Sequence, residues 1–173
     1  TFAKNLEELT ISLTFIESLG NLPTLPNIRK LNITCNEGNY MFLLSPVQST
    51  IEQLTVQIWK ETYHRQLANA PSVFMPKLKH LSIKALTSHS CITDLVNCTG
   101  VSLERLVTET NGDLSIQLPA SERLHIEVKH AGTITSLSTW MQSIALFLSK
   151  LTFRSMSLTI DNIRALAHCK QLS

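Results

Sequence analysis

Apolar residues recur along the chain in a fixed pattern, in which one apolar residue is followed by two more at the third and fifth positions after it. The complete copies are Leu6/Leu9/Ile11, Ile28/Leu31/Ile33, Ile51/Leu54/Val56 and Leu78/Leu81/Ile83. The incomplete or divergent copies are Leu103/Leu106/Thr108, Leu124/Ile126 after Ser121, Leu148/Leu151/Phe153, and a last start at Cys169/Leu172. The copies start at positions 6, 28, 51, 78, 103, 121, 148 and 169, a spacing of 18 to 27 residues. A period of this length along nearly the whole chain indicates a solenoid of repeated units.

Each copy predicts one short strand, because alternate residues of a strand point to opposite faces. The apolar residues then point into the solenoid, and the residues between them point outward. One coil cannot bury its own apolar edge, whereas stacked coils share a continuous core. The predicted fold class is therefore α/β, with about seven irregular strand–loop–helix coils curved into a horseshoe around a parallel inner sheet.

The segments between the strands predict returns of two kinds. Positions 136–148 and 159–168 place their apolar residues on one helical face, and positions 92–96 suggest a shorter helix. The first returns contain Pro23, Pro26 and Pro46, which favours irregular segments or one-turn helices. We therefore expect the helices to be better formed in the C-terminal half.

Composition narrows the class of protein without naming a function. The 173 residues are 43% hydrophobic and 16% charged, so one ordered domain is expected. A net charge of +2 gives no reason to expect nucleic-acid or membrane binding, and no apolar run is long enough to span a bilayer. The chain starts at Thr1 without a methionine and stops inside another repeat, so we interpret residues 1–173 as one repeat domain from a longer, multi-domain protein. The scattered cysteines Cys35, Cys91, Cys98 and Cys169 favour reduced thiols over a disulfide framework.

The strand pattern and the helical returns together make the chain similar to the leucine-rich-repeat superfamily. The stretch Ala165-Leu-Ala-His-Cys-Lys-Gln-Leu172 resembles the A-L-x-x-C-x-x-L repeats of the C-terminal arrays of NLR immune receptors (nucleotide-binding, leucine-rich-repeat proteins). The divergent stretch 121–128 is also similar to their coils. F-box proteins with leucine-rich repeats are the second resemblance. The chain contains neither a phosphate-binding G-x-x-x-x-G-K-[ST] loop nor a recognisable F-box, and asparagine fills the usual turn slot only at Asn36 and Asn111.

The sequence patterns that could indicate a catalytic or metal site do not meet the geometry or composition that such sites need. His125, Glu127 and His130 do not share one face of a strand, and His89, Cys91 and Cys98 lack a fourth ligand and a C-x-x-C pair. There is no G-x-S-x-G elbow and no cluster of glycines. We therefore expect no enzyme activity, no metal and no cofactor.

Two aromatic residues and two sequons leave alternatives open. Trp140 is expected in the core, whereas Trp59, just past a strand, could either cap the core or protrude as an interface anchor. Asn32-Ile-Thr34 and Asn97-Cys-Thr99 are N-glycosylation acceptors by sequence. Asn32 also lies in the middle of the predicted inner sheet face, where a glycan would cover the surface.

The outward residues of the strands form the predicted binding face. One column across the strands reads Glu8, Lys30, Gln53, His80, Arg105, Arg123 and Lys150, and becomes basic toward the C-terminal end. A basic stripe favours an acidic or phosphorylated protein segment. The predicted partner-binding residues are Lys30, Asn32, Gln53, Thr55, His80, Lys84, Arg105, Arg123, His125, Lys150 and Arg154.

The resemblance implies a non-enzymatic protein-recognition scaffold in the cytoplasm, namely the ligand-sensing or autoinhibitory array of an NLR-type receptor of innate immunity. Its partner would be another protein or a neighbouring domain of the same chain, with no nucleic acid and no membrane insertion. The first alternative is the substrate-recognition repeats of an F-box ubiquitin-ligase adaptor. The second is a secreted or cell-surface receptor ectodomain, which the sequons keep open.

Overall fold

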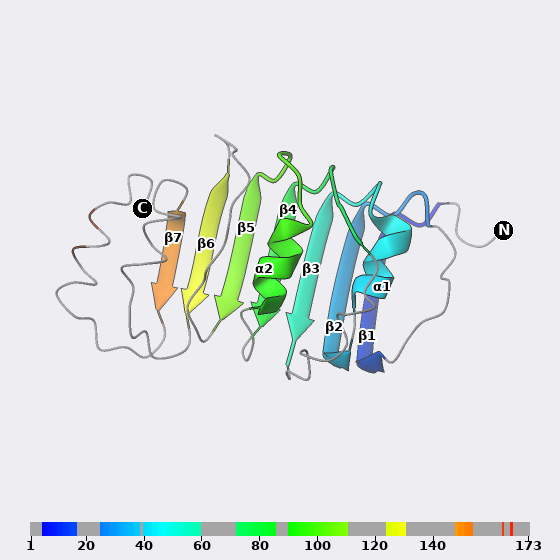
Figure 1. Cartoon of the computed structure of the whole chain (residues 1–173), viewed down its shortest axis with the longest axis horizontal. Helices are drawn as coiled ribbons and strands as arrows, with labels where there is room; N and C mark the ends of the chain where they lie inside the picture. The colour runs from blue at the N-terminus through cyan, green and yellow to red at the C-terminus, as the bar shows by residue number, and fades with distance from the viewer. Residues whose placement is uncertain are drawn as a thin grey trace.

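Seven strands lie side by side in one parallel sheet, in the same order as in the chain (Figure 1). They are β1 (Glu8–Ile16), β2 (Lys30–Gly38), β3 (Gln53–Ile58), β4 (His80–Ala85), β5 (Arg105–Thr110), β6 (His125–His130) and β7 (Leu148–Phe153). This computed structural model describes residues 5–16, 25–38, 40–59, 72–85, 90–110, 124–130 and 148–153, with positions 164 and 167. Each strand pairs with the next one along the chain, so the arrangement is solenoid-like, as the period predicted.

The strands stack with the repeat pattern in register from β1 to β5. The second apolar position of each copy aligns across the sheet as Leu9, Leu31, Leu54, Leu81 and Leu106. The third position aligns in the same way as Ile11, Ile33, Val56, Ile83 and Thr108. From β2 to β5, the side chains at both positions are buried, each no more than 1% exposed. The predicted alternation of buried and outward residues is confirmed there.

The prediction for the register of β6 was wrong by two residues. Ile126, not Leu124, pairs with Leu106, and Val128 pairs with Thr108. The apolar residues of this copy alternate from Leu124 through Ile126 to Val128, and a shift of two residues keeps every side chain on the same face. Burial alone therefore does not distinguish the two registers. A further irregularity brings Leu148 of β7 beside Ile126 and Lys150 beside Glu127.

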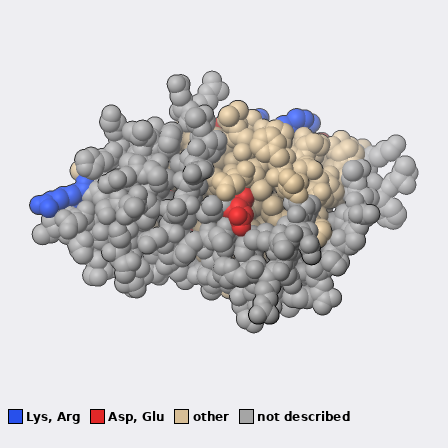
Figure 2. All heavy atoms as spheres, in the orientation of Figure 1, with Lys and Arg blue, Asp and Glu red and all other residues tan. Residues whose placement is uncertain are grey.

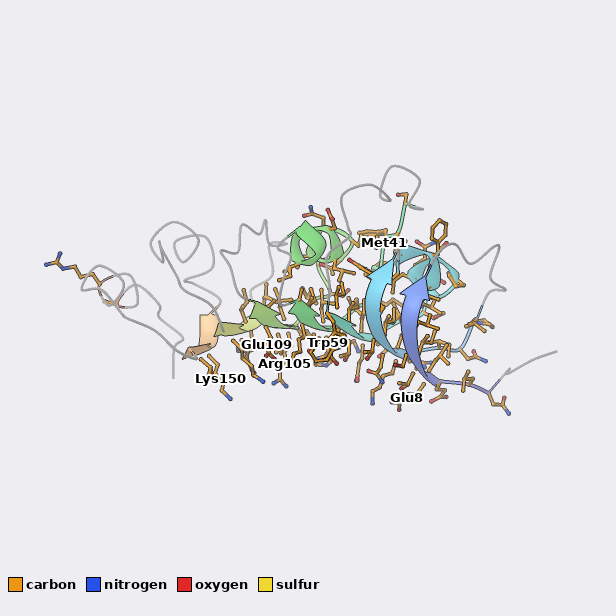
Figure 3. All side chains as sticks on the ribbon, turned by 90° about the horizontal axis from the view of Figure 1, so that it is seen from below. Glu8, Met41, Trp59, Arg105, Glu109 and Lys150 are labelled. Carbon is orange, nitrogen blue, oxygen red and sulfur yellow. The ribbon has the colours of Figure 1, made fainter. Side chains whose placement is uncertain are left out.

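The described helices lie on one face of the sheet, over the strands from β1 to β4 (Figures 1 and 3). They are α1 (Met41–Leu44), the 3-10 turn η1 (Ser45–Val47) and α2 (Ser90–Asn97). Pro46 is near the start of η1, where its fixed φ is tolerated, so the one-turn return predicted there is confirmed. The short helix predicted around 92–96 is also confirmed, and its apolar residues Ile92, Leu95 and Val96 are at most 2% exposed against the sheet.

The two longer predicted helices lie mostly outside the described residues. Of the helix predicted over 136–148, only Leu148 is described, and it begins β7 rather than ending a helix. Of the helix predicted over 159–168, Arg164 is helical and Ala167 lies in a turn. Among the described residues, none of the helices has the length and apolarity needed to cross a bilayer.

The residue just before each of the strands β1 to β5 connects its coil to the next coil. Its carbonyl accepts two N–H groups from the next coil: Glu7 O accepts from Arg29 N at 2.8 Å and from Lys30 N at 3.0 Å. The same arrangement recurs at Arg29, Glu52 and Lys79, and His125 N donates to Glu104 O at 2.8 Å. These paired hydrogen bonds satisfy backbone groups at the strand starts and fix the register of each new strand.

The side chains of these pre-strand residues alternate in charge from one coil to the next. In chain order they are Glu7, Arg29, Glu52, Lys79 and Glu104. Glu52 contacts the cations on both sides, with its Oε1 2.6 Å from Arg29 Nη1 and its Oε2 3.6 Å from Lys79 Nζ. The hydrogen bond from Arg29 and the nearby charge of Lys79 hold the pKa of the Glu52 carboxyl below its usual value.

Candidate functional site

The side of the sheet turned away from α1 and α2 carries the outward strand residues (Figure 3). We call it the open face, and its described side chains form three rows across the strands. The first row is Glu8, Lys30, Gln53, His80, Arg105 and His125; the second is Thr10, Asn32, Thr55, Ser82, Val107, Glu127 and Lys150; the third is Ser12, Thr34, Gln57, Lys84, Glu109, Lys129 and Thr152. The described surface on the opposite, helix-covered side shows mainly uncharged residues, with acidic atoms near the middle of the view (Figure 2).

The structure places most of the predicted partner-binding residues on the open face. Those described there are Lys30, Asn32, Gln53, Thr55, His80, Lys84, Arg105, His125 and Lys150. Arg123 and Arg154 lie outside the described residues. Whether these side chains bind a partner stays a prediction.

The middle of the open face holds a hollow of about 350 Å³. It extends from β2 to β5, and its lining residues are Lys30, Gln53, Leu54, Thr55, His80, Leu81, Ser82, Arg105 and Val107. The hollow exists because long first-row side chains stand beside the short second-row side chains of Thr55, Ser82 and Val107. Leu54 and Leu81 lie at the bottom of the hollow. Their side chains are 1% exposed and belong to the core.

Only some of the predicted partner-binding residues line the hollow. Lys30, Gln53, Thr55, His80 and Arg105 line it, whereas Asn32, Lys84, His125 and Lys150 do not. The predicted partner-binding residues did not include Ser82 and Val107, although both lie at outward strand positions. Comparing side-chain sizes between neighbouring rows would have been the signal for them.

Three of the described cations on the open face, Lys30, Lys84 and Arg105, are paired with carboxylates from neighbouring strands. Lys30 Nζ lies 2.8 Å from Glu8 Oε1, and Lys84 Nζ lies 3.4 Å from Glu109 Oε1. Arg105 Nη2 donates to Glu127 Oε1 at 2.6 Å. The hydrogen bond from Lys30 holds the pKa of the Glu8 carboxyl below its usual value. The repeat spacing placed Glu8 beside Lys30, but the side-chain contact became visible only in the structure.

The basic column predicted from the sequence is corrected by the register of β6. His125, and not Arg123, lies beside Arg105 in the first row, because the two strands pair two residues later than expected. Lys150 lies beside Glu127, in the second row. The described first row therefore changes from acidic Glu8 to a mixture of lysine, glutamine, histidine and arginine, and does not end in adjacent arginines.

Asn32 is held by its neighbours on β1. Its Nδ2 donates to Thr10 Oγ1 at 3.1 Å and lies 3.4 Å from Glu8 Oε1. It adjoins the hollow without lining it. A glycan on Asn32 would therefore extend over the side of the open face where the hollow begins.

Trp59 protrudes and does not cap the core, whereas its role as an interface anchor stays a prediction. Its side chain is 45% exposed, just past the end of β3. Lys84 Nζ lies 5.4 Å from the centroid of the Trp59 ring, within the range of a cation–π contact. Trp140 lies outside the described residues.

The other residues considered as reactive or metal-binding are the cysteines and the group around His125. Cys35 and Cys98 are free, and burial raises the pKa of the Cys35 thiol to about 11 and also raises that of Cys98. Both thiols are therefore poor nucleophiles. His125 and Glu127 share the open face, and no group of three or more metal-ligating residues is found within the described part of the chain.

Together, the open face offers ammonium, guanidinium, imidazole, amide and hydroxyl groups around one hollow. This set can donate several hydrogen bonds to oxygen acceptors presented by a ligand. Comparison of the chain with protein-family models, with curated proteins and with solved structures gives no match.

Proposed function

We propose that this chain is a non-enzymatic protein-recognition array, a leucine-rich-repeat horseshoe of about seven strand–loop–helix coils. Its support is the parallel sheet, in which the apolar positions of successive copies align from β1 to β5. Stacked repeats of this kind present an extended face made of one or two outward residues per strand. In this proposal, the open face is the binding surface.

The observation that carries the proposal is the hollow on the open face. Four consecutive strands contribute to it, and the helices α1 and α2 lie on the other side of the sheet. A hollow of about 350 Å³ has room for one or two side chains of a partner. The exposed ring of Trp59 supplies an aromatic contact on the same face.

The cellular setting that we propose is an intracellular, cytoplasmic NLR-type receptor, with the F-box adaptor as alternative. The free thiols of Cys35 and Cys98 fit a reducing compartment. The stretch Ala165–Leu172 carries the resemblance to NLR repeats. A nucleotide-binding module upstream in the same gene product would support the first setting, and an F-box the second.

A receptor ectodomain is the second candidate function, because Asn97 is exposed at the end of α2 and could carry a glycan. Measuring the mass of the protein from mammalian cells before and after enzymatic deglycosylation tests this setting. A mass loss that maps to Asn97 would favour the ectodomain. A mass loss that maps to Asn32 would also contradict binding at this part of the open face.

The binding proposal is tested by selecting peptides from a random library on the immobilised chain and measuring their affinity for variants. We expect Thr55→Trp to abolish binding, because the indole would fill the hollow from the exposed second row. The matched control is Asn97→Trp, which adds the same side chain at an exposed position on the other side of the sheet.

Both variants must keep the unfolding midpoint of the parent chain for the comparison to count. Should Thr55→Trp bind the selected peptides as well as the parent, the hollow is not the recognition site. Should Asn97→Trp alone lose binding, recognition takes place on the helix-covered side.

A further inference from the structure

The lining of the hollow has one sign of charge. Of the described residues that line it, Lys30 and Arg105 are cationic, and none is acidic. Lys30 on β2 and Arg105 on β5 are separated by three strand spacings, about 14 Å at 4.8 Å per strand. The hollow is therefore bounded by a cation at each end, with the imidazole of His80 between them.

Each end cation is held by a carboxylate that lies outside the hollow. Glu8 is on β1, beyond Lys30, and Glu127 is on β6, beyond Arg105. Both ion pairs therefore draw their cation away from the middle of the hollow, in opposite directions. The side chain of Lys30 is 43% exposed and that of Arg105 is 50% exposed. The side chain of Glu8 is 55% exposed, whereas that of Glu127 is 19% exposed. The Lys30–Glu8 pair is exposed on both sides and contributes little net stability, so a competing anion can replace it at small cost, and replacing the Arg105–Glu127 pair costs more.

We propose that the hollow receives carboxylate side chains of an acidic peptide segment from a partner protein, and that Glu8 and Glu127 limit its affinity by holding Lys30 and Arg105 in competing ion pairs. The inference rests on the proposed function and specifies the chemistry of the partner. Lys30 has three N–H donors and Arg105 has five, so both can turn from Glu8 and Glu127 to the incoming carboxylates. Removing the two cations and removing the two acids therefore have opposite effects on binding.

The test is fluorescence anisotropy with a fluorescein-labelled hexaglutamate peptide at an ionic strength of about 0.15 M, where exposed charges more than about 8 Å apart are largely screened. Six extended residues span about 20 Å, enough to reach from Lys30 to Arg105. The double variant Lys30→Gln/Arg105→Gln is expected to bind roughly tenfold more weakly than the parent chain. The double variant Glu8→Gln/Glu127→Gln is expected to bind several-fold more tightly.

Matched controls separate this site from general charge attraction. Lys77→Gln/Lys129→Gln removes the same charge from two lysines that do not line the hollow and are not among the predicted partner-binding residues, and Glu109→Gln removes a carboxylate from the third row. Both are expected to leave the affinity within about twofold of the parent, because neither changes the hollow. Equal losses for the two lysine-containing double variants would overturn the proposal in favour of net charge alone.

Other outcomes overturn one or both parts of the proposal. If Glu8→Gln/Glu127→Gln does not bind more tightly, the two acids do not restrain the site. If hexaglutamate does not bind the parent chain or that variant, the hollow is not a carboxylate site. In that case, Thr55→Trp can still abolish binding of the selected peptides. Failure of the carboxylate proposal is therefore distinguishable from failure of the protein-recognition proposal.

Discussion

Lys84 of β4 places its ammonium group 5.4 Å from the centroid of the Trp59 ring, across the end of β3. The same ammonium is 3.4 Å from Glu109 Oε1, so one lysine joins three neighbouring strands on the open face. The exposed indole of Trp59 is thereby held beside a charged network that joins β4 to β5.

This contact should appear as a coupling energy in a double-mutant cycle. Trp59→Leu and Lys84→Met, alone and together, are expected to give a coupling of about 0.5 kcal/mol in the free energy of unfolding, the size of an exposed cation–π contact. Urea denaturation measures it. A cycle between Trp59 and Lys129, which are three strands apart, should give a coupling near zero. Equal couplings in both cycles would contradict a specific contact.

Thr108→Val is expected to stabilise the protein. Thr108 is fully buried, and its Oγ1 is the one buried side-chain oxygen or nitrogen in the described residues without a hydrogen-bond partner. The other strands from β1 to β6 carry isoleucine or valine at this position of the pattern. Replacing the hydroxyl with a methyl group should raise the free energy of unfolding by about 1 kcal/mol.

Thr99→Val is the matched control, since Thr99 is also buried but its hydroxyl donates to Val96 O at 2.8 Å. The same replacement should there lower the free energy of unfolding by about 1 kcal/mol. Both values follow from denaturant titrations under one set of conditions. Destabilisation by Thr108→Val would show that its hydroxyl has a partner in solution.

Glu52→Gln should weaken the protein at neutral pH and lose its effect in acid. The pKa of Glu52 in the folded chain lies below the ordinary value of 4.5, mainly because Arg29 donates a hydrogen bond to the carboxylate. A lowered pKa contributes stability above the unfolded value, and the contribution disappears as the pH falls through the folded value. The difference in unfolding free energy between parent and variant should therefore shrink from about pH 6 to about pH 3. A constant difference across this range would mean that the ion pairs of Glu52 are not its source.

Leu81→Ala should cost more stability than Leu9→Ala, although both leucines occupy the same position of the repeat pattern. Leu81 is 1% exposed between two neighbouring strands, whereas Leu9 is only partly buried on β1, at the end of the described sheet. We expect a loss of about 2–5 kcal/mol for Leu81→Ala and a smaller loss for Leu9→Ala. Urea denaturation of both variants checks the order. Equal losses would show that β1 is as well covered in solution as β4.

The repeat pattern predicted the strands well because burial and strand periodicity act on the same residues. From β2 to β5, each coil must place two apolar side chains in one shared core, and a shift by one residue would expose them. The shift at β6 shows the limit of this reasoning. Leu124, Ile126 and Val128 satisfy the alternation in either register, and the hydrogen bond from His125 N to Glu104 O selects one of them.

The candidate site was predictable only as far as the direction of each side chain. Strand parity placed Lys30, His80 and Arg105 on one face, but their ion pairs with acids on neighbouring strands depend on side-chain conformations that the pattern does not specify. The hollow arises from a difference in size between neighbouring rows, which emerges only after the strands are aligned. The interpretation of Trp59 likewise depended on where the end of β3 lies relative to Lys84.

The alternating charges before the strands restrict how such a molecule can be lengthened or shortened. Deleting the coil that carries Glu52 would bring Arg29 beside Lys79, and duplicating it would set two glutamates side by side, both unfavourable arrangements. Gain or loss of two consecutive coils would leave every neighbour opposite in sign. In the stretch from Glu7 to Glu104, the unit that evolution can copy without electrostatic conflict is the pair of coils.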